Sequence, residues 1–163
     1  MPRDGGPTRR RILDAALQVL RTGGIESFSV EAVARGAVVA KGLVIYHFGS
    51  RAELLRQCGT ALRADRARRL AQARNSAPGV RGIDACWAEL RRQTADGTTR
   101  AWLGLLAAGA AASPGDVGAD SVVTEGLLDG CAIALAAGVA EESVREAHDA
   151  LWLAALQVTE EGA

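Results

Sequence analysis

Residues 29–48 of the 163-residue chain read SVEAVARGAVVAKGLVIYHF and hold two short helical patterns joined by a tight turn. The first pattern begins at Ser29, and its apolar residues recur at spacings of three and four: Val30, Val33, Ala34 and Ala37. The second pattern runs from about Ala40 to Tyr46. Apolar residues at such spacings predict amphipathic helices. Two short helices separated by a tight turn are the geometry of a helix-turn-helix, so this stretch decides the expected fold.

The second of these helices carries side chains that a purely buried helix would not need. Lys41, the only lysine of the chain, stands at its start. Gly42 follows and has no side chain to block close approach to a sugar-phosphate backbone or a base pair. Tyr46 and His47 add hydrogen-bond donors near the other end. A solvated surface turn is the simpler interpretation of each residue alone, but the set together predicts contact with DNA.

Helical patterns flank this stretch on both sides. Thr8 precedes an apolar stripe that stops at Gly23 and Gly24, and the stripe consists of Ile12, Leu13, Ala16, Leu17 and Leu20. On the other side, Ser50 and Glu53 have the spacing of a capping box, in which the hydroxyl and the carboxylate each satisfy a free backbone N–H. The long helix that begins there is expected to end at the turn-forming residues 75–79.

The C-terminal part of the chain is also predicted to be helical. The patterns favour helices from about 83 to 95, 99 to 112, 122 to 138 and 141 to 158, with a loop at residues 113–119. No segment of useful length alternates with a period of two, so the predicted fold class is all-α.

Residues 8–57 resemble the DNA-binding domain of the TetR family of bacterial transcriptional regulators. The resemblance rests on residues 11–16, 29–30, 40–48 and 50–55, with no insertion or deletion between Ser29 and Phe48. It implies a three-helix head with a helix-turn-helix in residues 1–56, and a long fourth helix leading into a helical ligand-binding and dimerisation domain in residues 57–163. The implied function is that of a homodimeric repressor of palindromic operators, released by a small-molecule effector.

The resemblance also implies which residues meet the DNA operator. Ser29 would cap the second helix and place its N-terminus on a phosphate, while Lys41 would reach a phosphate or a guanine edge. Gly42 would permit the close approach. Leu43 and Ile45 would face the major groove, where they replace more polar family residues and favour thymine methyls and DNA shape. The remaining expected backbone contacts are Tyr46, His47 and Arg51.

The turn between the two helices departs from the family's pattern at Val38, where relatives usually have glycine. A β-branched residue in the left-handed conformation costs about 1–2 kcal/mol. Two interpretations stay open: the turn is strained at Val38, or the helix before it ends early at Gly36. Phe48, at the far end of the stretch, is expected to pack between the first and fourth helices instead of touching DNA.

The same resemblance places a homodimer interface in residues 120–138 and 141–159, where helices of two subunits would pair. Gly126 and Gly130 would let the helices approach closely, whereas an ordinary monomer core is the alternative. The candidate walls of an effector pocket, each explained more simply by core packing alone, are Trp87, Leu90, Trp102, Leu106, His148 and Trp152.

The charge of the chain is divided unevenly although its formal net charge is zero. Residues 1–70 contain 13 basic and six acidic side chains, a net charge of +7, so residues 71–163 carry −7. Such an asymmetry indicates a partner, and a basic head with an acidic body favours an oriented approach to phosphate.

Several other classes of protein are disfavoured. The three cysteines are widely spaced, which favours a reducing compartment. The apolar part of the longest uncharged stretch, residues 101–115, is too short to span a bilayer, and the N-terminus lacks the apolar run of a signal peptide. A soluble, cytoplasmic protein with no membrane partner is therefore expected.

An enzyme is the first alternative function. The only histidines are His47 and His148, and His148 and Asp149 are expected to face different sides of a helix, so that they cannot form an orienting pair. No motif indicates a catalytic residue, a metal site or a cofactor. A second alternative is a helix-turn-helix head that acts as a protein-interaction module without ligand control.

Overall fold

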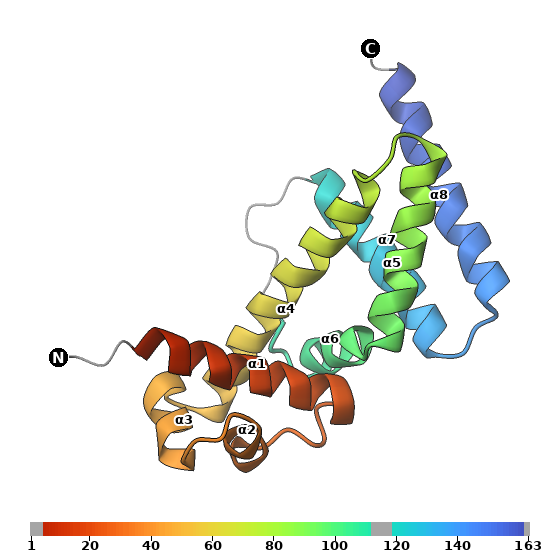
Figure 1. The fold of residues 1–163 in the computed structure, drawn as a ribbon. Coiled ribbons are helices and arrows are strands. Elements are labelled where there is room, and N and C mark those ends of the chain that lie inside the picture. Colours follow the sequence, from red (N-terminus) through yellow and green to blue (C-terminus); the bar gives the residue numbers. More distant parts are fainter. Residues whose placement is uncertain (1–4, 112–118, 162–163) are drawn as a thin grey trace. The chain divides into compact units, whose positions relative to one another are not determined.

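The computed structural model describes residues 5–111 and 119–161, which form helices and no strand. The predicted all-α class is confirmed (Figure 1). The predicted loop at residues 113–119 lies outside the described residues, apart from Ala119. The helices are α1 (Gly5–Gly23), α2 (Val30–Gly36), α3 (Lys41–Phe48), α4 (Arg51–Arg74), α5 (Val80–Ala95), α6 (Thr98–Ala107), α7 (Ala119–Ala136) and α8 (Glu141–Glu161).

The chain divides into two compact units. The first, which we call the head unit, comprises residues 1–64 and 100–113, and the second, the body unit, comprises residues 65–99 and 114–163. The division therefore falls within α4 and again within α6. A functional boundary between residues 56 and 57 stays a prediction. Within the described part of the chain, no helix is both long and apolar enough to cross a membrane.

The head unit is held by one apolar core. In α1, the buried residues recur every four positions and so share one face of the helix. The core includes Ile12, Ala16 and Leu20 of α1, Val33 of α2, Val44 and Phe48 of α3, Leu54 and Leu62 of α4, and Trp102 and Leu105 of α6. Helix α6 thus completes the head core, although it follows α4 by more than 20 residues. Phe48 is buried in this core, as expected.

A glycine permits the close approach between α4 and the chain that follows α6. A Cβ atom at Gly59 would lie 2.1 Å from the carbonyl oxygen of Ala110. A change of side-chain rotamer cannot relieve this overlap, because the atom that the Cβ would meet belongs to the backbone. The residue at position 59 must therefore be glycine for the segment after α6 to reach the core.

The turn between α2 and α3 combines the two interpretations that the sequence leaves open. Helix α2 ends at Gly36, and Val38 adopts a left-handed conformation with φ of 53°. The Val38 side chain is 86% exposed, so little packing compensates for its conformation. The strain therefore stays in the turn.

The predicted capping box at the start of α4 is only half formed. The Ser50 hydroxyl accepts a hydrogen bond from the Glu53 backbone N–H at 3.1 Å, as expected. The prediction of the reciprocal bond, from the Ser50 N–H to the Glu53 carboxylate, is wrong. The Glu53 carboxylate accepts a hydrogen bond from Arg56 Nε at 2.8 Å, and the Ser50 N–H donates to the Phe48 carbonyl at 2.9 Å. An arginine one turn later in the helix therefore takes the place of the backbone donor.

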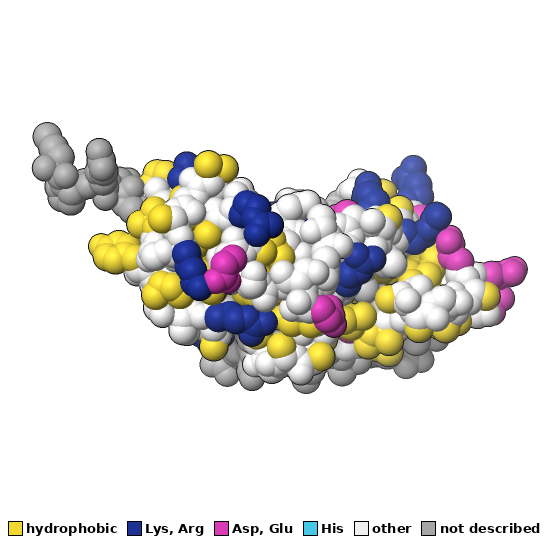
Figure 2. Space-filling view, turned by 90° about the horizontal axis from the view of Figure 1, so that it is seen from below, with side chains coloured by type: hydrophobic (Ala, Val, Ile, Leu, Met, Phe, Trp, Pro, Cys, Tyr) yellow, Lys and Arg dark blue, Asp and Glu magenta, His cyan; other side chains and the backbone are white. Residues whose placement is uncertain are grey.

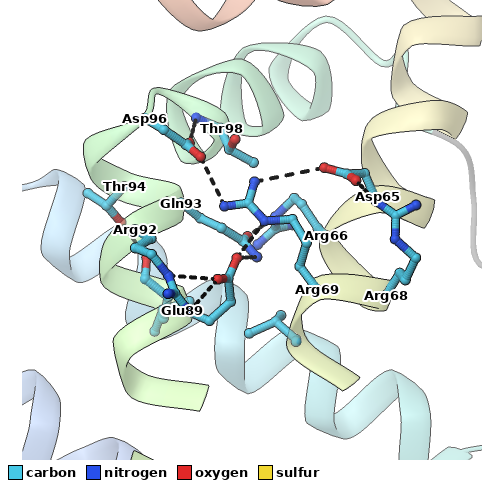
Figure 3. A network of polar contacts seen from close by, with 12 residues as sticks. Asp65, Arg66, Arg68, Arg69, Glu89, Arg92, Gln93, Thr94, Asp96 and Thr98 are labelled. Carbon is cyan, nitrogen blue, oxygen red and sulfur yellow. Dashed lines mark hydrogen bonds and ion pairs between the residues drawn. The ribbon is translucent and has the colours of Figure 1, made fainter. Parts of the chain in front are cut away.

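The body unit combines a small apolar cluster with a polar network. The apolar cluster consists of Trp87, Leu90, Cys131, Ala132 and Val144, where α5, α7 and α8 meet. The network joins the C-terminal part of α4 to α5 and α7 (Figure 3).

Two arginines of α4 carry this network. Buried Arg66 lies 2.7 Å from Asp129 of α7 and donates to the Gln93 side chain of α5 at 3.1 Å. One turn further on, Arg69 lies 2.6 Å from buried Glu89 of α5. Buried charges are tolerated when they are paired and hydrogen-bonded in this way.

Candidate nucleic-acid interface

Helix α3 is fixed in the head unit by its two buried residues, Val44 and Phe48. They stand four positions apart and therefore lie on the same face of the helix. The same helix leaves Lys41, Ile45 and Tyr46 exposed, and Tyr46 keeps 80% of its surface. The sequence thus folds α3 with an apolar inner side and an outer side that offers a cation, an aliphatic group and a phenol.

Figure 2 shows the molecule from below the view of Figure 1, so that the side of the head unit with α2 and α3 faces the reader. Over the head unit, Lys and Arg side chains are spaced across this face, with apolar side chains between them and an acidic side chain beside one of them. This distribution suits a polyanion, whose charges are also spaced.

Gly42 leaves the start of this face open. A Cβ atom at this position would meet no atom within 4 Å, so the packing of the protein itself does not require glycine there. Leu43 is half-buried and offers only part of its side chain to a groove. At the end of the helix, the Tyr46 and His47 rings are 5.3 Å apart between centroids and meet edge to face.

Lys41 forms an ion pair with Glu31 of α2. Both side chains remain well exposed, at 60% for Lys41 and 56% for Glu31. The hydrogen bond from Lys41 lowers the pKa of Glu31. The sequence offers no signal for this pair, because its members stand ten positions apart on different helices and only the turn brings them together.

Ser29 and Arg51 are brought to the start of α2. The Ser29 hydroxyl accepts a hydrogen bond from the Ala32 N–H at 3.0 Å and so caps the helix. Arg51, from the first turn of α4, donates to the carbonyl of Phe28 at 3.4 Å, and its guanidinium lies over the Phe28 ring. The Ser29 hydroxyl and the Arg51 guanidinium thus both lie at the N-terminal end of α2, because Arg51 contacts Phe28, the residue before Ser29.

Arg9 is a basic residue beside α3 that the sequence prediction leaves out of the site. Its guanidinium carbon lies 4.9 Å from the centre of the Phe48 ring, and it donates a hydrogen bond to the Gln57 side chain. The exposed run of Arg9, Arg10 and Arg11 in α1 is the signal that could have indicated it.

The six effector-pocket candidates fall into two groups, in different units. Trp102 is buried in the core of the head unit, and Leu106 of the same helix is 41% exposed. The other four belong to the body unit, where Trp87 and Leu90 form part of the apolar cluster. An effector site in the body unit therefore remains a prediction for Trp87, Leu90, His148 and Trp152.

His148 is fully buried and has partners on both ring nitrogens. Its Nδ1 lies 3.1 Å from the Asp149 carboxylate, and its Nε2 accepts the Trp152 indole N–H at 3.1 Å. Burial lowers the pKa of His148, which fits a neutral ring with the proton on Nδ1. The expectation that His148 and Asp149 cannot pair is wrong, because the Asp149 carboxylate turns back along α8 to reach its neighbour.

Helices α7 and α8 border an apolar groove of about 370 Å³. Its walls include Leu127, Gly130, Ala134, Val139, Val144 and Leu151. Leu127, Ile133, Val139 and Leu153 are exposed apolar side chains of the same two helices or of the turn between them. Cβ atoms at Gly126 and Gly130 would meet nothing within 4 Å among the residues that the structure describes, so none of these residues packs closely against them.

Comparisons with known proteins agree with the geometry of the head unit. The family described as "Bacterial regulatory proteins, tetR family" matches residues 12–58, which include α2 and α3. The HTH-type transcriptional regulator UidR of Escherichia coli (strain K12) is 30% identical over 84 residues, which cover 52% of this chain and 41% of UidR. SrpR of Pseudomonas putida, also an HTH-type transcriptional regulator, is 42% identical over 48 residues, or 29% of this chain and 22% of SrpR. The match thus spans less than half the length of these curated regulators.

A solved structure extends the likeness to the whole fold. The crystal structure of the multidrug binding protein EbrR complexed with imidazole matches with a TM-score of 0.63 and 25% identity, over 93% of either chain. The helix-turn-helix of the head unit, the sequence matches and this common fold agree. The chain thus carries the DNA-binding domain of the TetR family of bacterial regulatory proteins.

Proposed function

We propose that the chain is a DNA-binding transcriptional regulator whose helix α3 enters the major groove of a palindromic operator. The observation that carries the proposal is the two-sided build of α3. Val44 and Phe48 hold the helix in the head core, while Lys41, Ile45 and Tyr46 stand outward. A rigid helix with exposed polar and apolar groups is what direct readout of base edges requires.

The contacts divide into positioning and reading. Lys41, Tyr46 and Arg51 supply donors for phosphates, which fix the register of the head on the duplex. His47 and the Ser29 hydroxyl add donors of the same kind. Ile45, with the exposed part of Leu43, offers apolar contact to thymine methyls, and Gly42 leaves space for the sugar-phosphate backbone.

Homodimerisation is proposed through residues 120–138 and 141–159. The exposed apolar side chains and the groove of α7 and α8 support it, because apolar surface of this kind marks an interaction site. The open surface at Gly126 and Gly130 gives a helix of the second subunit room to approach. A two-fold dimer would place two α3 helices about 34–36 Å, or a multiple of that distance, apart on the DNA.

Control by a small molecule is proposed for the body unit, with repression as the default state. EbrR is described as a multidrug binding protein, and in the body unit of this chain Trp87, Leu90, His148 and Trp152 form an aromatic and apolar group. A ligand there can release the operator only by its difference in affinity for the two states. A bacterial regulator of this kind would act in the cytoplasm, where the chromosome lies.

Selection of bound sites from random duplex DNA by the purified protein tests this function. We expect enrichment of a palindrome whose half-sites are one helical turn, or a multiple of one turn, apart. Failure to enrich any sequence would contradict sequence-specific binding. It would favour the second candidate, a head that acts as a protein-interaction module.

A further inference from the structure

The ion pair between Lys41 and Glu31 lies within the face proposed to meet DNA. Lys41 opens α3, and Glu31 stands in the first turn of α2, two residues after the helix cap Ser29. The positive charge assigned to phosphate contact is therefore already paired in the free protein. Its partner, Glu31, carries a negative charge, which repels phosphate.

The free energy of the ion pair is small enough for a DNA phosphate to replace Glu31 as the partner of Lys41. More than half of each side chain is exposed, and exposed ion pairs are worth about 0.2–1 kcal/mol. A phosphate held at a fixed place beside Lys41 can replace the carboxylate at little cost. A phosphate that moves relative to the head competes poorly with Glu31, which the fold keeps close to the ammonium group.

These two situations correspond to two kinds of complex with DNA. On a random duplex, binding is a loose electrostatic association, and no base contact fixes the head. On the operator, base contacts set the register and hold each phosphate beside its donor. The same ion pair thus meets a mobile phosphate in one complex and a fixed phosphate in the other.

We propose that Glu31 is a residue that limits the affinity for DNA, because its carboxylate keeps Lys41 from phosphate on random DNA and has to be displaced from Lys41 on the operator. This inference rests on the proposed DNA-binding function. Glu31 lowers affinity for both kinds of DNA, and it lowers affinity for the operator more. Operator binding gives up the whole free energy of the pair, whereas on random DNA Lys41 forgoes only a weaker contact with a mobile phosphate. Its presence therefore narrows the ratio between operator and random binding.

Glu31→Gln is the variant that tests this role, and Glu26→Gln is its matched control. Glu26 is also an exposed glutamate of the head unit, in the turn before α2, so both variants remove one negative charge from the same unit. Only Glu31 is paired with Lys41. A difference between the variants therefore reports the pair and not the net charge.

The measurement is the affinity for a random 30-base-pair duplex and for the selected operator, each titrated with salt. On random DNA, we expect Glu31→Gln to tighten binding beyond Glu26→Gln by less than about five-fold, which is the upper limit for one exposed ion pair. The salt slope should steepen by about 0.9, because Lys41 then neutralises one more phosphate. On the operator, the gain should be larger, because the pair no longer has to be broken, and the slope should be unchanged.

Repeating both glutamate variants in a protein that lacks Lys41 tests whether the effect of Glu31 acts through Lys41. In Lys41→Gln, the effect of Glu31→Gln on random DNA should vanish, whereas that of Glu26→Gln should persist. Equal effects of the two glutamate variants, or an effect of Glu31→Gln that survives loss of Lys41, would overturn the inference and leave the proposed function standing. Failure of the unaltered protein to bind DNA would instead overturn the proposed function.

Discussion

The head and body units are both helical, but different kinds of contact hold their helices in place. In the head unit, α1 to α4 and α6 share one apolar core. In the body unit, α4 is joined to α5 and α7 through Arg66 and Arg69, beside a much smaller apolar cluster. Apolar packing tolerates many outer surfaces and suits a unit whose outside binds DNA. Charge pairing depends on the exact position of each partner, so the contacts of the body unit fix how this part of α4 lies against α5 and α7.

The largest effect is expected from the core of the head unit, where adjacent leucines of α6 provide a matched pair. Leu105 is fully buried and Leu106 is 41% exposed. Leu105→Ala should lower the free energy of unfolding by about 2–5 kcal/mol, through lost burial and a cavity. Leu106→Ala should cost less than about 1 kcal/mol. Equal losses in denaturant unfolding would contradict the placement of α6 in the head core.

In the body unit, a buried ion pair should be worth more than an exposed one. Asp129→Asn leaves the buried Arg66 without its carboxylate and should cost about 1–3 kcal/mol. The control is Glu141→Gln, which breaks the pair with Arg91 at 3.0 Å, where both side chains are more than half exposed. That change should cost under about 1 kcal/mol. If both variants melt at the same temperature, the network does not hold α4 in the body unit.

The two units should also respond differently to mild acid. Burial lowers the pKa of His148 in the folded body unit below the ordinary value of about 6.5, so the unfolded chain takes up this proton first as the pH falls. Stability from the neutral ring is complete above pH 6.5 and is lost as the pH falls toward the folded-state pKa. Tryptophan fluorescence during unfolding should therefore report a lower free energy of unfolding at pH 5.5 than at pH 7. In His148→Gln, the difference between the two pH values should shrink, and an unchanged difference would assign it to other groups.

The smallest effect is expected at Val38, in the turn of the head unit. Val38→Gly relieves the left-handed strain but makes the unfolded chain more flexible, so a net gain of about 0.5–1 kcal/mol remains. The melting temperature should rise by about 2 °C. Val38→Ala keeps a Cβ atom and should gain less. A lower melting temperature for Val38→Gly would show that the turn is not strained.

The course of the helices could be predicted from the sequence because apolar spacing is a local signal. Ser29 and Ser50 mark helix starts, and Val38 stands at the predicted strained turn. What a helix packs against is not local. The sequence predicts a helix at residues 99–112 but not its place in the head core, where Trp102, one of the six pocket candidates, is buried.

The charged contacts could be predicted least. An arginine in a helix is usually exposed, and the partner that makes Arg66 an exception, Asp129, is 63 residues away in sequence. The pairing of His148 with Asp149 was wrongly excluded, because helical spacing gives the direction of Cβ atoms and not the rotation of a carboxylate. The pair of Lys41 with Glu31 likewise depends on the turn between two helices.

The central claim is that the outer side of α3 binds DNA, and Lys41→Ala tests it most directly. The measurement is the affinity of the unaltered protein and of the variant for the selected operator over a range of salt concentrations. The account predicts weaker binding by the variant and a salt slope smaller by about 0.9, because one phosphate contact is lost. Unchanged affinity and an unchanged slope would contradict the assignment of α3 as the DNA-binding helix.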